Sequence, residues 1–287
     1  MSVRLGAAQL PGCTMDLAAN AECALRGARE AAARGARIIA LPELATVPYF
    51  CGDRTEPYRA WAEPADGPLS GRFAALARET GACILLPFYE HDPATGRYHN
   101  AVAGFGPDGA PLGEGTLARK LHLPIGTDPP PGYDEARHFA PGDGLQVVRV
   151  AGLGLGVLVC YDRRFPEAWR VLRAMGADLV VVPVAGSGGD DMEFFLGEMR
   201  THARENGLAV LCANKVGDEH IGGATVTNFG WSTIIGAEGA VLALRREAEG
   251  PGLVMADLDV AAIPGIRRTL RYFDHRRPDL WERARPR

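Results

Sequence analysis

The chain contains 287 residues with a formal net charge of −4; 47% of the residues are hydrophobic and 23% are charged. This balance is typical of a globular protein that is long enough to bury a sizeable core. The charge argues against a basic nucleic-acid-binding protein, and the sequence has no run of about 18 apolar residues that could span a membrane. We therefore expect a protein that acts on a small molecule, with neither a nucleic acid nor a membrane as its partner.

Cysteine usage and the N-terminus indicate the cellular compartment. The cysteines lie scattered along the chain without paired spacing, which favours reduced thiols over a disulfide framework. The first residues lack the basic and apolar pattern of a signal peptide. Both features predict a cytoplasmic protein. The six cysteines are Cys13, Cys23, Cys51, Cys83, Cys160 and Cys212.

Strand and helix patterns interleave along the whole chain. Short apolar runs bounded by turn residues predict strands, and amphipathic stretches with capping residues predict helices. This alternation, with hairpins inserted, predicts an α/β layered fold with mixed sheets. In chain order we expect a strand at 3–9, a helix at 16–34, a strand at 37–41, a helix at 70–80, strands at 82–87, 100–105, 111–117, 145–150 and 154–160, a helix at 166–175, a strand at 178–184, a helix at 191–206, and strands at 208–214, 232–235, 240–244 and 253–258.

The domain organisation follows from composition. No Ser- or Pro-rich linker divides the chain, so we expect one domain over residues 1–262. The remaining residues, 263–287, are rich in arginine with acidic residues interleaved. We expect this tail to be a C-terminal arm that contacts another subunit of a homo-oligomer.

Cys160 is the most informative residue of the sequence. It ends the apolar run 155–160, and Pro166 and Glu167 then open a helix. The carboxyl ends of strands are where α/β proteins place their chemistry. Cys160 is therefore a candidate nucleophile, although most free cysteines are buried structural residues.

Two further reactive side chains also follow apolar strands. Glu43 comes after the run 38–42, and Lys120 follows the strand that ends at 116–119. A cysteine thiol titrates near pH ~8.5 and needs a base, and a carboxylate whose pKa an apolar cleft raises toward neutrality can be that base. An ammonium group can stabilise the oxyanion of a tetrahedral intermediate. The alternative is that Glu43 and Lys120 are surface residues or ion-pair partners.

Together these segments resemble a known family. Residues 41–44, 119–124 and 160–167 are similar to the motifs of the nitrilase superfamily of carbon–nitrogen hydrolases in residue type, chain order and separation. The resemblance runs from about residue 3 to about residue 259. It implies a four-layer α-β-β-α sandwich with two mixed sheets, assembly into dimers or larger oligomers, and a Glu-Lys-Cys triad. It also implies that no metal or organic cofactor is needed.

The resemblance extends to a fourth residue, Glu135. The loop 131–143 resembles the one that gives many members a second active-site glutamate, which implies that Glu135 orients Lys120 or helps to position substrate. A solvated loop carboxylate is the alternative. In the implied mechanism Glu43 takes the Cys160 proton and the thiolate attacks an amide or ureido carbon. The Lys120 ammonium and the backbone N–H of Tyr161 then stabilise the oxyanion.

The residues after Cys160 bear on the substrate. Tyr161-Asp162 resembles the amidase and carbamoylase branches rather than the nitrile-cleaving ones. Arg163 and Arg164 resemble a pair in the N-carbamoyl-D-amino acid amidohydrolases, where arginine binds the substrate carboxylate. For Arg163, a salt bridge that braces the loop is the alternative. The loop 130–135 instead resembles that of N-carbamoylputrescine amidases, which bind a cationic tail.

Two more residues are candidates for the pocket wall. Tyr49 lies close to Glu43 in the sequence and His122 lies beside Lys120. Core packing of Tyr49 and a hydrogen-bonded structural role of His122 are the alternatives. The sequence thus predicts cysteine-dependent hydrolysis of a small N-carbamoyl or amide substrate. An omega-amidase, an aliphatic amidase and a catalytically silent binding subunit remain the other possibilities.

Overall fold

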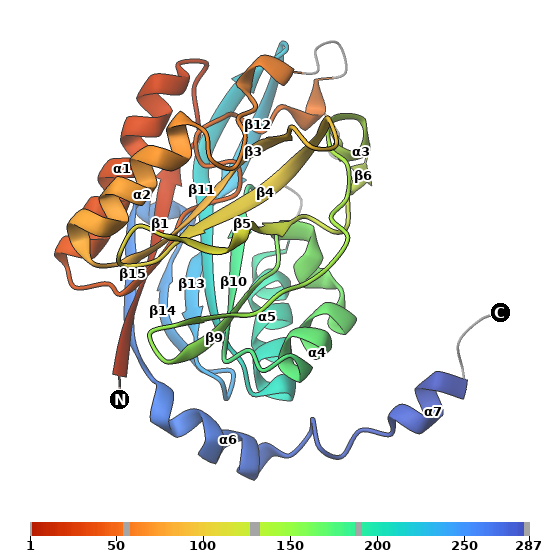
Figure 1. The fold of residues 1–287 in the computed structure, drawn as a ribbon. Coiled ribbons are helices and arrows are strands. Elements are labelled where there is room, and N and C mark those ends of the chain that lie inside the picture. The colour runs from red at the N-terminus through yellow and green to blue at the C-terminus, as the bar shows by residue number, and fades with distance from the viewer. Residues whose placement is uncertain (1, 54–57, 127–132, 187–190, 284–287) are drawn as a thin grey trace.

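The computed structural model describes residues 2–53, 58–126, 133–186 and 191–283 (Figure 1). The α-helices are α1 (Leu17–Ala33), α2 (Pro68–Thr80), α3 (Glu135–His138), α4 (Pro166–Ala174), α5 (Met192–Asn206), α6 (Ile263–Leu270) and α7 (Pro278–Arg283). The strands are β1 (Ser2–Pro11), β2 (Ile38–Ala40), β3 (Cys83–Asp92), β4 (Arg97–Phe105), β5 (Pro111–Arg119), β6 (Ile125–Gly126), β7 (Tyr133–Asp134), β8 (Val148–Val150), β9 (Leu153–Val157), β10 (Leu179–Val184), β11 (Ala209–Ile221), β12 (Ala224–Phe229), β13 (Ser232–Ile235), β14 (Val241–Arg245) and β15 (Gly252–Asp259). Short 3₁₀ helices include η1 (Phe50–Gly52) and η3 (Cys160–Arg164).

The protein has a mixed α/β fold built on one large sheet. Thirteen strands are connected by hydrogen bonds in the order β5-β4-β3-β2-β1-β11-β10-β9-β8, with β15 beside β1, β13 and β12 beside β11, and β14 beside β13. Strands β1, β2 and β3 are parallel, as are β9, β10 and β11, whereas the flanking strands run antiparallel. Only Leu10 and Pro11 of β1 pair with β11. The sheet therefore consists of two halves that join at one short contact.

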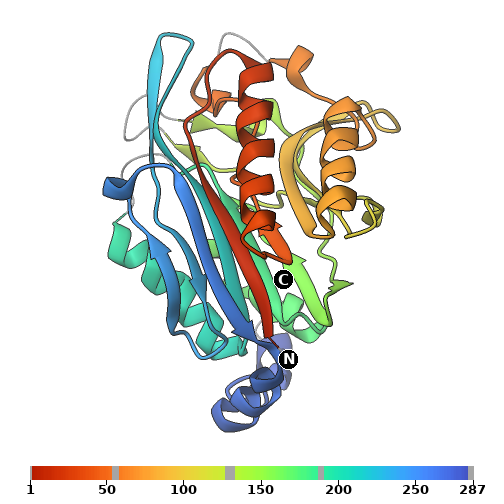
Figure 2. The same ribbon diagram turned by 90° about the vertical axis from the view of Figure 1, so that its left-hand side faces the viewer.

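Each half of the sheet has its own pair of helices. Helices α1 and α2 contact β1, β2, β3, β4 and β15, whereas α5 contacts β11 and β13 and packs beside α4. Figure 2 shows the two pairs of helices on opposite sides of the molecule. One buried cluster lies between the first half and α1–α2, and another lies between the second half and α4–α5. A third cluster joins Leu5 and Ile38 of the first half to Leu155 and Leu179 of the second.

Local sequence explains where the helices begin and end. The Asp16 side chain caps α1 by accepting a hydrogen bond from the Ala19 N–H, and Asp191 caps α5 in the same way. Pro166 stands in the first turn of α4, where its missing N–H costs nothing. Helix α5 ends at Gly207, whose φ of 62° lies in the left-handed region that favours glycine. These signals confirm the predicted helices to within a few residues.

The predicted strands are confirmed in order, but several boundaries were wrong, including those of β3, which continues to Asp92, and β4, which begins at Arg97. Strand β9 ends at Val157, so Cys160 lies in η3 rather than in the strand expected at 154–160. The strand expected at 145–150 is shortened to β8. Strand β11 continues past 214 and pairs with β12, which was not predicted. The Gly222-Gly223 turn that joins β11 and β12 is a hairpin signal that the sequence offered.

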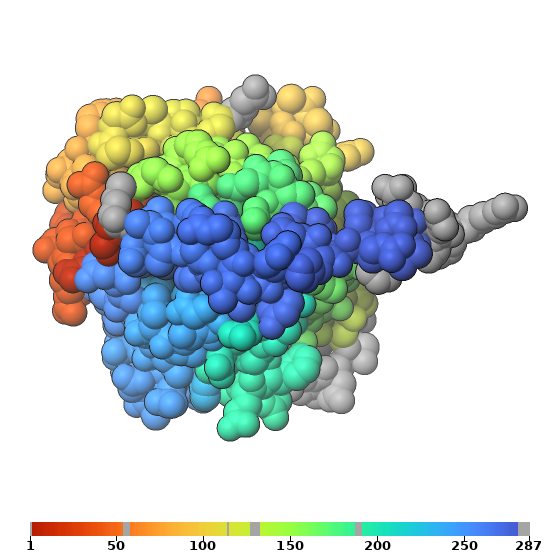
Figure 3. Space-filling view, turned by 90° about the horizontal axis from the view of Figure 1, so that it is seen from below, coloured from red at the N-terminus to blue at the C-terminus, as the bar shows by residue number. Residues whose placement is uncertain are grey.

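The C-terminal region leaves the body of the protein after α6. Ile263 is 1% exposed, and the Arg267 guanidinium lies 2.8 Å from Asp178 Oδ1 and donates to the Gly207 carbonyl, so α6 is anchored to the sheet. The following segment crosses one face and then projects away from the other elements (Figure 3). None of the helices in the described residues combines the length and the apolar character that crossing a bilayer requires.

Candidate active site

Three distant segments bring an amine, two carboxyl groups and a thiol together. The Lys120 ammonium donates to Glu43 Oε1 at 2.8 Å and to Glu135 Oε1 at 2.6 Å. The Cys160 side chain is near enough to Glu43 that its interaction helps to lower the pKa of that carboxyl group. Lys120, Glu43 and Glu135 are each no more than 1% exposed. The structure thus brings together all four residues that the sequence marked as catalytic.

The backbone presents Cys160 on a sharp turn. Its φ is +50°, a left-handed conformation that is uncommon for a residue with a side chain. The turn lies between β9 and α4, and the Trp169 indole N–H fixes it by donating to the Arg163 carbonyl at 2.8 Å. Such strained positions persist only where the surrounding structure determines them, and they cluster at functional sites. Cys160 keeps some exposure to solvent, as a nucleophile needs.

Glu43 is held by more donors than the sequence indicated. Besides Lys120, the Asn100 amide donates to Oε1 at 2.7 Å and the Ala185 N–H donates to Oε2 at 2.8 Å. Asn100 lies in β4 and is fully buried. Sequence reasoning missed it, although a lone amide within an apolar strand is the expected sign of a buried polar partner.

The pKa of Glu43 differs from the sequence-based expectation. Burial favours the neutral carboxyl group, but the Lys120 charge and the hydrogen bonds from Lys120, Cys160 and Ala185 outweigh burial and lower the pKa of Glu43. Glu43 is therefore ionised and able to accept a proton. The protein around the sulfur and the negative charge of Glu43 raise the pKa of Cys160, so the thiol keeps its proton until a base removes it.

Glu135 is the carboxyl group with the raised pKa. Burial is the largest cause, and together with the Glu43 charge it outweighs the Lys120 ammonium and raises the pKa of Glu135 to about 7. The Tyr49 hydroxyl donates to Glu135 Oε1 at 2.8 Å. Among the described residues, Glu135 Oε2 has no hydrogen-bond partner. Two adjacent carboxyl groups thus differ in protonation near neutral pH, which is a common arrangement in acid–base sites.

Asp162 ties the Lys120 segment to the nucleophile turn. Its carboxylate accepts hydrogen bonds from the N–H groups of Leu121, His122 and Val159 at 2.9–3.2 Å. His122 Nδ1 lies 2.8 Å from Asp162 Oδ1, and its ring stacks on Phe165 with 3.5 Å between centroids. Sequence reasoning gave Asp162 no role, because three of its partners are backbone groups that no motif reveals. The position of His122 agrees with its hydrogen-bonded alternative.

Comparison with known proteins identifies the family. Residues 4–268 match the family profile described as carbon-nitrogen hydrolase. The chain belongs to the carbon–nitrogen hydrolase family. It is 34% identical over 282 residues to N-carbamoylputrescine amidase of Arabidopsis thaliana, a match that covers 94% of this chain and 91% of that protein.

Solved structures agree with this assignment. A carbon-nitrogen hydrolase from Helicobacter pylori G27 matches with a TM-score of 0.88 and 26% identity over 100% of this chain and 99% of that one. A mutant amidase from Nesterenkonia sp. AN1 matches with a TM-score of 0.78 and 26% identity over 99% and 97%. That amidase carries the acetamide moiety of fluoroacetamide bound covalently to its active-site cysteine. The resemblance to the nitrilase superfamily is confirmed, and the protein is a hydrolase that acts on amides.

In this hydrolase Arg163 braces the nucleophile turn. Its Nη1 donates to the Cys160 carbonyl at 3.0 Å, its Nε lies 3.3 Å from Glu198 Oε2, and its guanidinium stacks over Phe195. The residue is 2% exposed. Arg164 and Tyr161 are partly exposed on the same turn, and Tyr161 packs edge-on against Phe165. These contacts favour the bracing alternative for Arg163.

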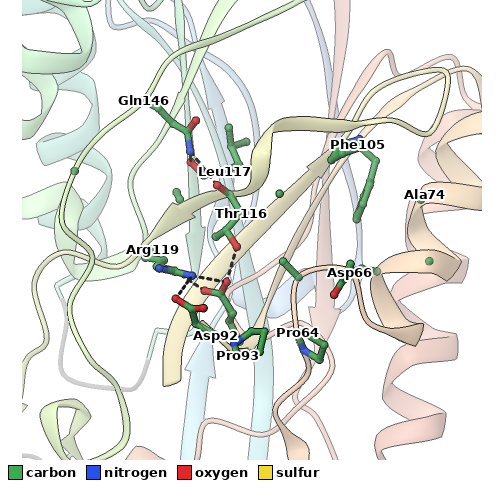
Figure 4. Close-up of a pocket in the computed structure, with 18 of the residues that line it drawn as sticks. Pro64, Asp66, Ala74, Asp92, Pro93, Phe105, Thr116, Leu117, Arg119 and Gln146 are labelled. Atoms are coloured by element: carbon green, nitrogen blue, oxygen red, sulfur yellow. Dashed lines mark hydrogen bonds and ion pairs between the residues drawn. The ribbon is translucent and has the colours of Figure 1, made fainter. Parts of the chain in front are cut away.

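A groove of about 900 Å³, separate from the cluster of Lys120, Glu43, Glu135 and Cys160, lies along β5 and is lined by residues such as Thr116, Leu117 and Arg119 (Figure 4). Arg119 faces it and pairs with Glu90 and Asp92, whereas Lys120, the next residue, points to the catalytic cluster. Successive residues of an extended chain point to opposite faces, which explains the division. None of the nine predicted site residues lines this groove. Residues 130–132 of the loop that suggested a cationic substrate lie outside the described residues.

Replacing Asp162 should impair turnover of this hydrolase. Asp162→Asn puts an amide donor where three N–H groups donate, so Lys120 and Cys160 lose their shared anchor. We expect kcat for amide hydrolysis to fall about 10- to 100-fold, the effect of a small misplacement of reacting groups. Steady-state kinetics measure it, with the exposed Asp218→Asn as the control. If Asp162→Asn and Asp218→Asn have equal kcat values, Asp162 has no positioning role.

Proposed function

We propose that the protein is a Cys160-dependent amidohydrolase of small N-carbamoyl compounds, with Glu43, Lys120 and Glu135 as its other catalytic residues. The observation that carries this proposal is the geometry of one cluster. A single buried ammonium lies 2.8 Å and 2.6 Å from two carboxyl groups, and one of these, Glu43, also interacts with the Cys160 side chain. A nucleophile, its base and a cation for the oxyanion are then within reach of one carbonyl group.

The first half-reaction forms a thioester. Glu43 accepts the proton of Cys160 as the sulfur attacks the carbonyl or ureido carbon, and the C=O electrons move to oxygen. The Lys120 ammonium and the Tyr161 N–H stabilise that oxyanion. When the C–N bond breaks, Glu43 returns the proton to the departing amine or ammonia, so the acyl group remains on sulfur.

The second half-reaction uses the same carboxylate. Glu43 takes a proton from a water molecule that attacks the thioester, and the proton goes to the leaving Cys160 sulfur. Glu43 suits both steps because its pKa is lowered, so it is ionised, and because it interacts with the Cys160 side chain. Glu135 holds Lys120 in place, and its free Oε2 is available to accept a hydrogen bond from a substrate N–H.

The substrate class rests on the relative and on Arg163. The Arabidopsis thaliana relative is named for N-carbamoylputrescine, a substrate with a cationic tail. The Arg163 charge is engaged by Glu198 at 3.3 Å, which weakens the idea that it binds a substrate carboxylate. We therefore place N-carbamoyl amines first and N-carbamoyl amino acids, with Arg164 as their partner, second.

Tyr49, whose hydroxyl binds Glu135, acts in this scheme by orienting Glu135. His122 is 36% exposed and Asp162 holds its ring at 2.8 Å, so in this scheme it has a structural role and only its exposed edge could border the substrate.

The finer architecture is also proposed. We infer that the two halves of the sheet stack face to face as the inner layers of a four-layer α-β-β-α sandwich. Three separate buried clusters support this arrangement, one between the halves and one beneath each pair of helices. We infer one domain for residues 1–262. The arm that follows includes α6, which is anchored to the body, and Phe273, which packs against Arg173 of α4, so its free part begins after residue 273.

We propose that the arm and the outer face of α4 and α5 form a subunit contact. Exposed apolar side chains gather on these elements: Val171, Met175, Phe194, Tyr272 and Leu280. Apolar groups on such a surface favour burial against a second copy.

A reducing, cytoplasmic setting fits the six cysteines, which are all free thiols.

Loss of the nucleophile should abolish turnover and the covalent intermediate. With a panel of N-carbamoyl diamines, N-carbamoyl amino acids, β-ureido acids and plain amides, we expect ammonia release to be fastest for an N-carbamoyl diamine and absent for Cys160→Ala. Mass spectrometry of quenched reactions should detect an acyl adduct on the Cys160 peptide of the wild type. The adjacent but buried Cys51 provides the control, because Cys51→Ala should keep the adduct. Full turnover by Cys160→Ala would reject the proposed activity. So would a wild type that hydrolyses none of these substrates.

Activity should rise with pH through neutrality. The pKa of Glu135 is about 7, so this residue ionises as pH increases, and its new charge raises the proton affinity of nearby Glu43. We expect kcat/KM to increase between pH 6 and pH 8 with one apparent pKa near ~7. Glu135→Gln should remove this limb and lower kcat/KM. A wild-type profile that stays flat over this interval would contradict the assignment.

The subunit contact should depend on the apolar helix face. Phe194 is 59% exposed on α5, whereas Met15 is 56% exposed far from it in the chain. Analytical ultracentrifugation should find the wild type and Met15→Ser as the same oligomer, and Phe194→Ser or a chain ending at residue 270 as smaller species. If the wild type sediments as a monomer, the contact does not exist.

A further inference from the structure

A second buried ion pair lies outside the catalytic cluster. Lys215 and Glu219 of β11 are both 0% exposed, and Lys215 Nζ donates to Glu219 Oε1 at 2.8 Å. The pair lies where β11 leaves β10 and pairs with β1 and β12. Replacing such a pair by apolar residues is often neutral or stabilising, so its burial invites a role other than stability.

The pair holds backbone groups of the segment that follows Glu43. Lys215 Nζ donates to the Val47 carbonyl at 2.9 Å, and Glu219 Oε2 accepts from the Tyr49 N–H at 2.8 Å. Glu219 Oε1 also accepts from the Cys13 N–H at 2.7 Å. Residues 43–49 form neither helix nor strand. Charge-assisted bonds to peptide groups are therefore a main restraint on this segment.

The same segment carries two residues of the catalytic cluster. Glu43 stands at its start, and Tyr49 at its end donates from its hydroxyl to Glu135 Oε1. Glu135 in turn accepts from Lys120. Tyr49 therefore connects Glu219, which accepts from its N–H, to Glu135, which accepts from its hydroxyl, and Glu135 in turn binds Lys120.

We propose that Lys215 and Glu219 are positioning residues of the hydrolase, which fix residues 43–49 so that Tyr49 orients Glu135 and Glu43 faces Cys160. This inference rests on the proposed function. Neither residue contacts the reacting atoms. They act through the Val47 and Tyr49 peptide groups, and the orientation of Tyr49 is the step that reaches the catalytic carboxyl groups.

The pair should therefore influence how Glu135 titrates. Among the described residues, the titratable groups that face Glu135 are Lys120, Glu43, Tyr49, Cys51 and Cys160. The Tyr49 hydrogen bond favours the ionised form of Glu135. A displaced Tyr49 weakens that bond, so Glu135 stays protonated to higher pH.

The test is Glu219→Gln in the full chain, because glutamine keeps the size of the side chain but loses the charge that holds the Tyr49 N–H. We expect kcat to fall about 10- to 100-fold with little change in KM. We also expect the apparent pKa of the acidic limb, where kcat rises with pH, to increase by about half a pH unit or more. Tyr49→Phe should shift the limb in the same direction. When Tyr49→Phe is already present, Glu219→Gln should lower kcat by less than a further factor of about three, because both changes act along one path.

A purely structural role gives a different result. Leu258→Ala removes a buried side chain at the opposite end of β1, where Leu258 pairs with Val3, and should lower the melting temperature without moving the pH profile. If Glu219→Gln behaves like Leu258→Ala, or adds its full effect to Tyr49→Phe, the proposal is wrong. Should Glu219→Gln not fold, Lys215→Met/Glu219→Gln leaves no unpaired charge and is measured in the same way.

A second readout separates this inference from the proposed function. The rate of Cys160 alkylation by iodoacetamide, followed by peptide mass spectrometry, depends on Glu43 and Glu135 but needs no substrate. An upward shift of its pH midpoint in Glu219→Gln supports the positioning role even if no amide in the panel is hydrolysed. An unshifted midpoint overturns it even if the wild type is an active amidase.

Discussion

The buried Lys120 ammonium is the group on which the rest of the site depends. It lies within 2.8 Å of two buried carboxyl groups, and its charge favours the ionised form of each. Without that charge, burial and mutual repulsion would favour the protonated form of both carboxyl groups. Lys120 keeps Glu43 ionised despite its burial, which the proposed role of Glu43 as the base for Cys160 requires. The fold must therefore bring three chain segments to one point with little tolerance.

Irregular segments with charged anchors achieve this. Cys160, Leu44 and the residues near them depart from regular structure, and their φ values are positive. Asp162 anchors the nucleophile turn to the Lys120 segment, and the Lys215–Glu219 pair anchors the segment after Glu43. Each anchor places a buried charge against peptide groups, which resist displacement more strongly than neutral partners do. Catalytic geometry and backbone restraint thus use the same kind of interaction.

Sequence patterns predicted helices α1, α2, α4 and α5, the order of most strands and the residues that meet in the cluster, but not the shorter helices α3, α6 and α7. Apolar periodicity and capping residues are local signals, so they survive without knowledge of the fold. The extension of β11 and its pairing with β12 were missed because polar residues alternate with the buried Ile221 and Val226, so the hairpin has no continuous apolar run. Asn100 and Asp162 were missed because their partners lie far along the chain or are backbone groups.

The sequence by itself determined that a thiol at 160, an amine at 120 and a carboxyl group at 43 follow apolar strands, and its resemblance to the family added the carboxyl group at 135. Tertiary structure alone decided how they share charge. The number of donors around each carboxyl group lowers the pKa of Glu43 and leaves that of Glu135 raised, the reverse of what strand-end burial suggested for Glu43. It also directed Arg163 to Glu198 on α5. Coulomb and hydrogen-bond energies depend on distances of a few ångströms between remote segments, and no local pattern encodes those distances.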